Sequence, residues 1–349
     1  MDTWTGFQAG ANLGGWLSQY RRRDNHHFDS FIREADIQRI AGWGMDHVRL
    51  PVDYPVLEDD RAPFVYRESG LAWIDACLEW CQAAGLKLIL DLHRAPGFTF
   101  SAPGESRLFE RPRLQERFLR LWEALATHYL GRSPDGLVFE LMNEVVLPSS
   151  EPWNALARRA VERIRAIDPD RWIMIGSNRY NSAWMLKDLE RLPYSHLVYT
   201  FHFYEPMPFT HQKAHWGESL KTLNQSTPYP GLVPGLDGFL QSHPEYRTEL
   251  ERFLTTPMDE AYLHAHLKPA LDFAVERGLP LYCGEFGAID LAPLSSRLAW
   301  HRDICRLLNQ AGIGHAVWSY KEMGFSLVHY DGSLASQELI EIVSQNAGS

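Results

Sequence analysis

The stretch AAGLKLILDLH, residues 83–93, decides the fold of this chain. Gly85 follows a helical pattern and can adopt the left-handed conformation that closes a helix. The residues after it form an almost wholly apolar run that ends in polar side chains. The same succession recurs in three other places, at AGWGMDHVRLP (41–51), ERGLPLYCGEFG (276–287) and QAGIGHAVWSY (310–320). Continuous apolar runs are typical of strands covered on both faces, as in parallel sheets.

Counting all such runs gives eight predicted strands, near residues 8–13, 45–50, 87–92, 137–142, 172–176, 197–203, 280–285 and 314–319. Amphipathic helical patterns lie between most of them, at 70–84, 112–130, 152–167, 259–277 and 295–311. Pro269 should kink or divide its helix. This alternation predicts one domain over residues 1–349, a single (β/α)₈ TIM barrel. An open doubly wound sheet is the alternative, but GANLGGWL (10–17) lacks the GxGxxG spacing of such folds.

Two connections are too long for simple turns, and they follow the third and sixth predicted strands at 94–111 and 205–258. Long loops in compact domains are usually functional, and barrel enzymes build their sites at strand C-termini. The 205–258 segment contains aromatic and histidine side chains that suit contact with a sugar. Together with the 94–111 loop, we expect it to narrow one end of a cleft and to favour short glycosides or chain ends over attack within a chain.

Composition limits the classes of partner. A formal net charge of −10 argues against nucleic acid or an anionic membrane surface, and no apolar run reaches the roughly 18 residues of a membrane span. The four cysteines are too few for a disulfide scaffold, so we expect reduced thiols at Cys77, Cys81, Cys283 and Cys305. The start, MDTWTGFQAG, lacks the basic and apolar regions of a signal peptide. It predicts a cytoplasmic protein unless a signal was removed. The oligomeric state stays open.

Two glutamates stand at the C-terminal tips of separate predicted strands. Glu144 ends LVFELMNE (137–144), and Glu285 lies near the end of LPLYCGEFG. Paired carboxylates can hydrolyse a glycosidic bond: one protonates the leaving oxygen, and the other attacks the anomeric carbon or activates water. Glu140 lies about 13 Å further down the strand, so we expect it to be a buried structural carboxylate. Other strand tips carry Arg49, Asp91, His93, Asn143, His202, Tyr204 and Trp318.

In combination, these segments resemble glycoside hydrolase family 5, a family of (β/α)₈ retaining β-glycosidases. The resemblance rests on GANLGGWL, VRLP, DLHRAPG, the Asn-Glu pair, HFY, GEFG and VWSY. The opening and LHRAPG look most like the branch of exo-β-glucanases and β-glucosidases. One departure is Val145, where the family usually has proline.

The resemblance implies a role for each matching residue. Glu144 would be the general acid and then the general base, and Glu285 the nucleophile. The supporting residues would be Arg49 and Tyr204, which hold Glu285 as a carboxylate; His93 and His202, which contact the sugar or orient the carboxylates; Asn143, which binds the sugar 2-hydroxyl; and Trp318, which forms a floor under the sugar. We expect Trp16 and Trp43 to be core residues.

The leading functional hypothesis is therefore a retaining β-glycosidase acting on β-linked glucosides or glucans without metal or cofactor. An endo-acting cellulase, a β-mannanase-type hydrolase or a transglycosidase on the same fold stays open. From other classes, a metal-dependent barrel hydrolase is disfavoured because the first strand offers only Asn12 and no histidine pair. The intact glutamate pair disfavours a non-catalytic sugar-binding barrel. His211 and His215 have a possible metal spacing but no HExxH motif, so we expect them to face substrate or solvent.

Overall fold

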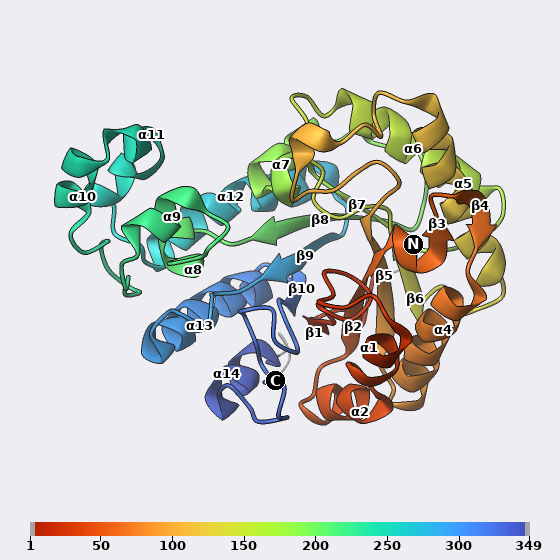
Figure 1. Cartoon of the computed structure of the whole chain (residues 1–349), viewed down its shortest axis with the longest axis horizontal. Helices are drawn as coiled ribbons and strands as arrows, with labels where there is room; N and C mark the ends of the chain where they lie inside the picture. The colour runs from red at the N-terminus through yellow and green to blue at the C-terminus, as the bar shows by residue number, and fades with distance from the viewer. Residues whose placement is uncertain (1–3, 346–349) are drawn as a thin grey trace.

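A computed structural model of the chain describes residues 4–345 and shows a closed barrel of eight parallel strands (Figure 1). Around the barrel the strands follow the order β1-β10-β9-β8-β7-β6-β5-β2, so each pairs with its sequential neighbours. The predicted TIM barrel is confirmed, and the open sheet is excluded because β1 pairs with both β10 and β2. The strands are β1 Ala9–Asn12, β2 His47–Asp53, β5 Lys87–Arg94, β6 Leu137–Glu140, β7 Ile173–Gly176, β8 Leu197–Phe203, β9 Leu281–Phe286 and β10 Gly314–Val317.

Long helices surround the strands and bury one face each. They are α2 Glu34–Gly42, α4 Glu68–Ala83, α5 Pro112–His128, α6 Glu151–Arg165, α12 Glu260–Arg277, α13 Leu294–Gln310 and, near the C-terminus, α14 Gln337–Val343. The expectation that Pro269 divides its helix is wrong, because α12 runs through it. Leu267 and Ala270, buried on either side of the proline, hold the two halves in place. Within residues 4–345, no helix has the length and apolarity needed to cross a bilayer.

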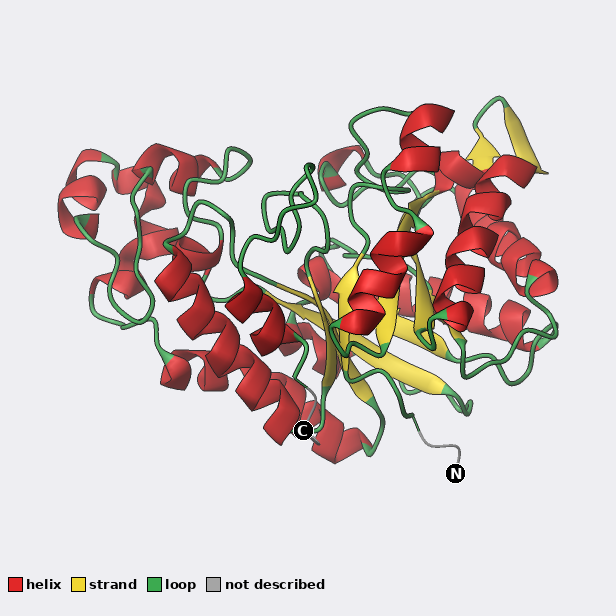
Figure 2. Cartoon of the chain, turned by 90° about the horizontal axis from the view of Figure 1, so that it is seen from below, coloured by secondary structure: helices red, strands yellow, loops and turns green. Residues whose placement is uncertain are grey.

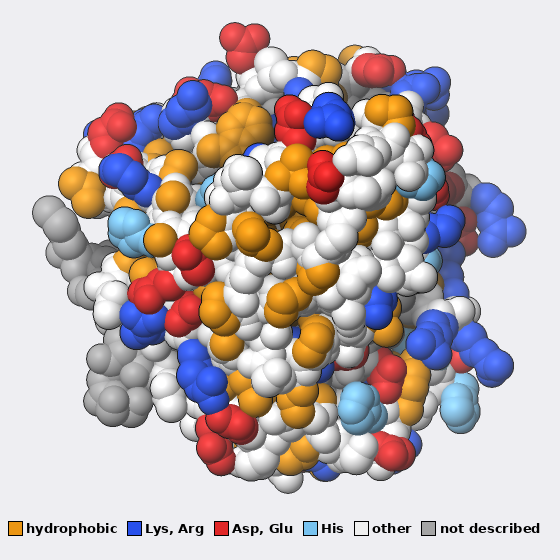
Figure 3. Space-filling model, turned by 90° about the vertical axis from the view of Figure 1, so that its left-hand side faces the viewer, with side chains coloured by type: hydrophobic (Ala, Val, Ile, Leu, Met, Phe, Trp, Pro, Cys, Tyr) orange, Lys and Arg blue, Asp and Glu red, His pale blue; other side chains and the backbone are white. Residues whose placement is uncertain are grey.

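The segment 205–258 is a cluster of short helices rather than an open loop (Figures 1 and 2). It comprises α8 Met207–Thr210, α9 Glu218–Leu223, α10 Leu236–Ser242, η3 Pro244–Tyr246, α11 Arg247–Leu250 and η4 Glu251–Leu254. The cluster projects beyond β8 and α12 at the left of Figure 1, and the space-filling view from that side mixes charged and apolar side chains (Figure 3). The 94–111 connection contains only the short η1 Pro103–Glu105.

The remaining short elements lie at the strand ends. They are α1 Asn25–Ser30, α3 Tyr54–Leu57, the antiparallel pair β3 Glu58–Asp59 and β4 Ala62–Tyr66, α7 Asn178–Asn181 and η2 Ala183–Asp188. Of these, α7 and η2 follow β7 directly, so they begin at the C-terminal end of the barrel.

The barrel interior is divided into an apolar and a polar part. One cluster of buried side chains fills the space between the strands near their N-terminal ends: Phe7, Ile89, Val138, Trp172, Met174, Val198, Tyr282 and Ala316. The next inward positions along the strands carry polar groups, among them Arg49, Asp91 and Glu140, each fully buried. A separate apolar core lies between the strands and the helices and includes all four cysteines, which are buried free thiols as predicted. This apolar cluster fills the end of the barrel where the strands begin, so the polar groups face the end where the strands finish.

A β-bulge in β9 determines which way Glu285 points. Thr200 of β8 pairs with Tyr282 and Phe201 with Cys283, but His202 pairs with Glu285, so Gly284 is an extra residue. Strict alternation from the inward Tyr282 would direct Glu285 outward, whereas the bulge turns it into the barrel beside His202.

Candidate active site

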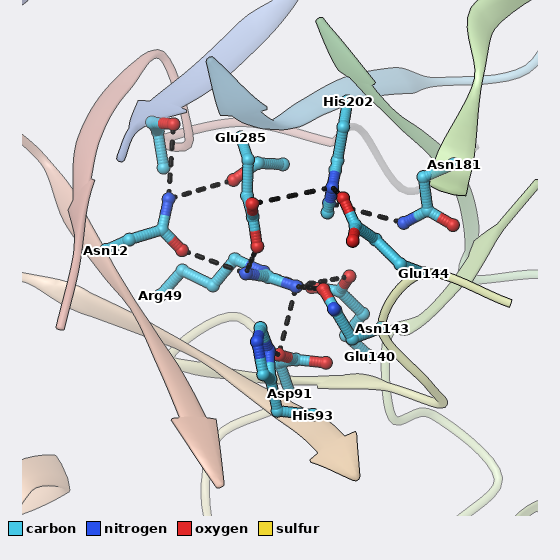
Figure 4. A network of polar contacts seen from close by, with 12 residues as sticks. Asn12, Arg49, Asp91, His93, Glu140, Asn143, Glu144, Asn181, His202 and Glu285 are labelled. Carbon is cyan, nitrogen blue, oxygen red and sulfur yellow. Dashed lines mark hydrogen bonds and ion pairs between the residues drawn. The ribbon is translucent and has the colours of Figure 1, made fainter. Parts of the chain in front are cut away.

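Arg49 is the centre of the polar network inside the barrel (Figure 4). Its guanidinium donates two hydrogen bonds to Glu140, at 2.7 and 3.0 Å, and one to Glu285 Oε1 at 2.7 Å. It also donates to the amide oxygens of Asn12 and Asn143, each at 2.9 Å. The carboxylates around it raise the pKa of Arg49 well above its usual value, although burial acts in the opposite direction. Arg49 is therefore a permanent cation under the strand tips.

Glu285 receives donors on both carboxylate oxygens. Arg49 binds Oε1, and the Tyr204 hydroxyl donates to Oε2 at 2.9 Å. Burial, followed by the nearby Glu285 and Glu144, raises the pKa of Tyr204 well above its usual value, so the phenol keeps its proton and remains a donor. Two donors, one of them cationic, stabilise the ionised form of a carboxylate. The surroundings of Glu285 thus suit a group that must act as an anion.

Glu144 has different surroundings. Its Oε1 lies 2.9 Å from His202 Nδ1, and the same nitrogen lies 3.5 Å from Glu285 Oε2. Burial raises the pKa of Glu144 to about 7, against the smaller opposing effects of His93 and Arg49. Burial also lowers the pKa of His202 to about 4, so the imidazole is neutral near pH 7. A carboxyl that keeps its proton near neutral pH can act as a general acid.

His93 and Trp318 form the wall next to Arg49. His93 Nδ1 lies 2.7 Å from Asp91 Oδ2, and the same carboxylate oxygen is 3.0 Å from Arg49 Nη2. The Trp318 ring lies parallel to the His93 ring, with centroids 5.8 Å apart, and Phe100 of the 94–111 connection meets His93 edge-on. Burial raises the pKa of Asp91 to about 7, although Arg49 opposes the shift. Strand β5 therefore contributes to the site the His93 imidazole, which Asp91 holds in place.

These contacts connect all eight residues predicted for the site at one end of the barrel: Arg49, His93, Asn143, Glu144, His202, Tyr204, Glu285 and Trp318. Glu140 is the fully buried partner of Arg49, in agreement with its predicted structural place. Trp16 is buried, with its indole bonded to the Phe28 carbonyl, and Trp43 packs against the core beside Tyr320, as expected.

One group of side chains could in principle hold a metal ion. Ligand atoms of Glu144, His202 and Glu285 all lie within 4.8 Å of one another, and this is the single such group among residues 4–345. A divalent cation there would meet the Arg49 guanidinium, which already occupies Glu285 at 2.7 Å. His211 and His215 form no such group in the same residues; His211 packs against Tyr204, and His215 is exposed. The trio is better suited to proton transfer than to metal binding.

Two amides that were not among the predicted site residues also belong to the network. Asn12 accepts from Arg49 and donates to the Gly284 carbonyl at 3.0 Å, so it ties the cation to the bulge. Asn181 donates from Nδ2 to His202 Nε2 at 3.2 Å. A signal for Asn181 was present, because the polar stretch SNRYN (177–181) directly follows the fifth apolar run.

Comparisons with known proteins identify the family of this chain. Residues 8–324 match the family described as cellulase, glycosyl hydrolase family 5. Endoglucanase C of Acetivibrio thermocellus is 46% identical over 97% of this chain and 98% of its own, and Cellodextrinase A of Ruminococcus flavefaciens is 37% identical over 88% and 84%. Among solved structures, Cel5A of Thermotoga maritima in complex with mannotriose aligns over 97% of both chains with a TM-score of 0.78 at 23% identity, a likeness of fold. The chain belongs to glycoside hydrolase family 5 and is a hydrolase of O-glycosidic bonds.

Proposed function

We propose that this protein is a retaining β-glucanase that cleaves within β-linked glucan chains by double displacement. One observation carries the mechanism: oxygens of Glu144 and Glu285 lie within 4.8 Å of each other. Retaining enzymes hold their carboxyls about 5–5.5 Å apart, whereas inverting enzymes leave roughly 6.5–9.5 Å for a water molecule. A close approach of this kind favours the retaining arrangement.

In this mechanism Glu285 attacks the anomeric carbon while Glu144 gives its proton to the leaving oxygen. Glu144 then removes a proton from water, which releases the glycosyl group from Glu285 with the β configuration restored. The raised pKa of Glu144, about 7, keeps a large protonated fraction at neutral pH. Arg49 and Tyr204 support Glu285 as the anion. Asn143, bonded to Arg49, is placed to meet the sugar 2-hydroxyl.

Internal cleavage of glucan is supported by the names of the relatives. The chain aligns with almost the full length of Endoglucanase C, whereas its match to a probable glucan 1,3-beta-glucosidase A of Aspergillus clavatus covers 43% of this chain. The endo-acting alternative therefore fits better than the exo-acting branch favoured by the opening motif. Cellodextrinase A, also similar over most of the chain, keeps short soluble glucans among the expected substrates.

The helical segment 205–258 supports a cleft with an aromatic wall. His211 contacts Tyr204 with ring centroids 5.1 Å apart, and the Trp216 ring, 54% exposed, lies 6.2 Å from His211. An exposed indole next to His211, which itself contacts Tyr204, can stack on a sugar ring. The segment would therefore bind substrate and need not block a chain that passes through the cleft.

Two measurements test the proposal. Proton NMR at early time should show a β-anomeric product from a β-glucan oligosaccharide, and an initial α product would exclude the retaining mechanism. Glu285→Gln should lose turnover on every substrate, because no glycosyl-enzyme can form. Glu144→Gln should lose far less on aryl glycosides with good leaving groups, and azide should partly rescue Glu144→Ala by replacing the activated water. Equal losses in both variants on good and poor leaving groups would contradict the assignment.

A further inference from the structure

Three consecutive residues after β7 have left-handed backbone conformations. The φ angles are +54° at Arg179, +62° at Tyr180 and +52° at Asn181. This conformation is unfavourable for residues other than glycine, although asparagine tolerates it better than most. Strain of this kind persists where the surrounding structure imposes it, and it concentrates at functional sites. The turn therefore needs a structural reason.

Contacts to neighbouring strands hold the turn in place. Tyr180 N–H donates to the carbonyl of Val145, the residue after Glu144, at 3.1 Å. Ser182 forms a parallel bridge with His202 of β8. The turn thus lies between the segment that carries Glu144 and the strand that carries His202.

This geometry places a buried amide next to the imidazole of His202. Asn181 is fully buried, and its Nδ2 lies 3.2 Å from His202 Nε2. Gly176, the last residue of β7, makes room for the amide: a Cβ there would lie 2.4 Å from Asn181 Oδ1 and 2.7 Å from Nδ2. A small residue on β7 and a strained turn after it together place one donor at one ring nitrogen.

The other ring nitrogen of His202, Nδ1, faces two carboxyls, and these determine which ring nitrogen must carry the imidazole proton. His202 Nδ1 lies 2.9 Å from Glu144 Oε1 and 3.5 Å from Glu285 Oε2. At every stage of double displacement one of these carboxyls is ionised, so Nδ1 must carry hydrogen to be a donor. A neutral imidazole has a single N–H, which leaves Nε2 as an acceptor that needs a donor. The Asn181 amide NH₂ supplies it.

We propose that Asn181 is a positioning residue that fixes His202 in the tautomer protonated on Nδ1. This inference rests on the proposed function, because it gives Nδ1–H a task in both half-reactions. It faces ionised Glu285 at 3.5 Å before attack, and it donates to Glu144 at 2.9 Å once Glu144 has lost its proton. With the opposite tautomer, the Nδ1 lone pair would face a carboxylate and would hold the Glu144 proton away from the leaving oxygen.

Other charged groups around His202 are unchanged by substitutions at Asn181. Arg49 from β2, His93 from β5, Glu140 from β6 and Glu285 from β9 all act on the imidazole, as does Glu144. None of these is on the turn. Asn181→Gly adds no charge, so a shift in its pH profile reports the loss of the Nε2 contact, whereas Asn181→Asp also adds a carboxyl beside the imidazole.

The first experiment replaces Asn181 in two ways. Asn181→Gly removes the amide and suits the positive φ without strain, and Asn181→Asp keeps the shape but makes the group an acceptor. We expect both to lower kcat on substrates with poor leaving groups by roughly 10- to 100-fold, as for other groups that orient a functional histidine. KM should change little, and activated aryl glycosides should be less affected. In Asn181→Asp the basic limb of the pH profile should move to lower pH, because an imidazolium beside Glu144 favours its ionised form.

Asn178 provides the matched control. It is a buried asparagine of the same turn, but its amide bonds to the backbone of Leu147 rather than to His202. Asn178→Ala should lower the melting temperature and leave the pH profile and leaving-group dependence unchanged. If Asn178→Ala and Asn181→Gly change the kinetics in the same way, Asn181 has only a structural role and the proposal fails.

Gly176→Ala tests the same contact from the opposite side. Its methyl group should displace the Asn181 amide and reproduce the kinetic loss of Asn181→Gly. In the Asn181→Gly background the methyl has room, so the second substitution should add little, a strong non-additivity between neighbours. Full additivity of the two losses would overturn the proposal.

Nitrogen-15 NMR of the histidine rings separates this inference from the proposed function. His202, assigned by its absence in His202→Gln, should show a protonated Nδ1 and a bare Nε2 in the wild type, and a protonated Nε2 in Asn181→Asp. A wild-type ring protonated on Nε2 would overturn the inference, even if the glutamate variants behave as a retaining mechanism requires. The expected tautomer with an inverted product would instead refute the mechanism alone.

Discussion

Glu144→Gln should make the protein more stable, and the gain should grow with pH. In the folded state burial raises the pKa of Glu144 from about 4.5 to about 7, so between these values the native state binds a proton more tightly than the unfolded chain does. Stability therefore falls as pH rises through this window and levels off above 7. Each pKa unit corresponds to about 1.4 kcal/mol. The ionisable side chain thus destabilises the fold by about 3 kcal/mol at pH 8, but by only about 1 kcal/mol at pH 5.

Glutamine has nearly the same shape and no charge to desolvate, so the variant escapes this penalty. Urea unfolding of wild type and variant at pH 5 and pH 8 measures the difference, and groups common to both proteins cancel. Glu110→Gln is the control, because Glu110 is exposed and its ion pair with Arg107 is loose, at 3.6 Å; it should follow the wild type at both pH values. A gain for Glu144→Gln that is equal at pH 5 and pH 8 would refute the raised pKa and, with it, the supply of protonated acid at neutral pH.

Four further outcomes are expected. Arg49→Lys keeps the charge but loses the planar guanidinium. Activity should therefore fall by orders of magnitude, and the free energy of unfolding should fall by a few kcal/mol. Near-normal turnover would contradict the support that Arg49 gives to Glu285. Activity should survive exhaustive dialysis against a chelator, because two carboxyls suffice for the chemistry; a loss that added zinc reverses would favour a metal hydrolase. Trp216→Ala should raise KM for short oligosaccharides with little change in melting temperature. With the wild-type protein, the viscosity of a soluble β-glucan should drop steeply at early times. Slow loss of viscosity with early release of mono- or disaccharide would instead indicate attack at chain ends.

The barrel was predictable because its strands are buried on both faces. The run predicted at 87–92 covers the first six residues of β5, Lys87–Arg94, and the run at 45–50 overlaps β2, His47–Asp53, with an error of a few residues. The polar tips were also visible, because an ionisable side chain at the end of an apolar run is conspicuous. The helices of 205–258 were not predicted, because segments of three to seven residues carry too few turns for a period to show.

The orientation of Glu285 could not be derived from alternation. Tyr282 and Glu285 are three residues apart, so a regular strand would place them on opposite faces, and only the extra Gly284 brings both inward. Asn181 was not predicted as a site residue for a related reason. Its place depends on three left-handed residues, and the sequence RYN contains no glycine to announce such a turn.

The depth of the Arg49 network explains why these hidden features matter for function. A guanidinium has five N–H donors, and all five hydrogen bonds are made: two to Glu140 and one each to Asn12, Asn143 and Glu285. No donor is spare, so Arg49 cannot turn toward one partner without abandoning another. Asn12 is bonded in turn to the Gly284 carbonyl, so the bulge that aims Glu285 and the cation that stabilises it are fixed by one chain of contacts. The position of the Glu285 carboxylate is thus fixed by contacts inside the barrel. His202, held by Asn181, controls where the proton of Glu144 is placed.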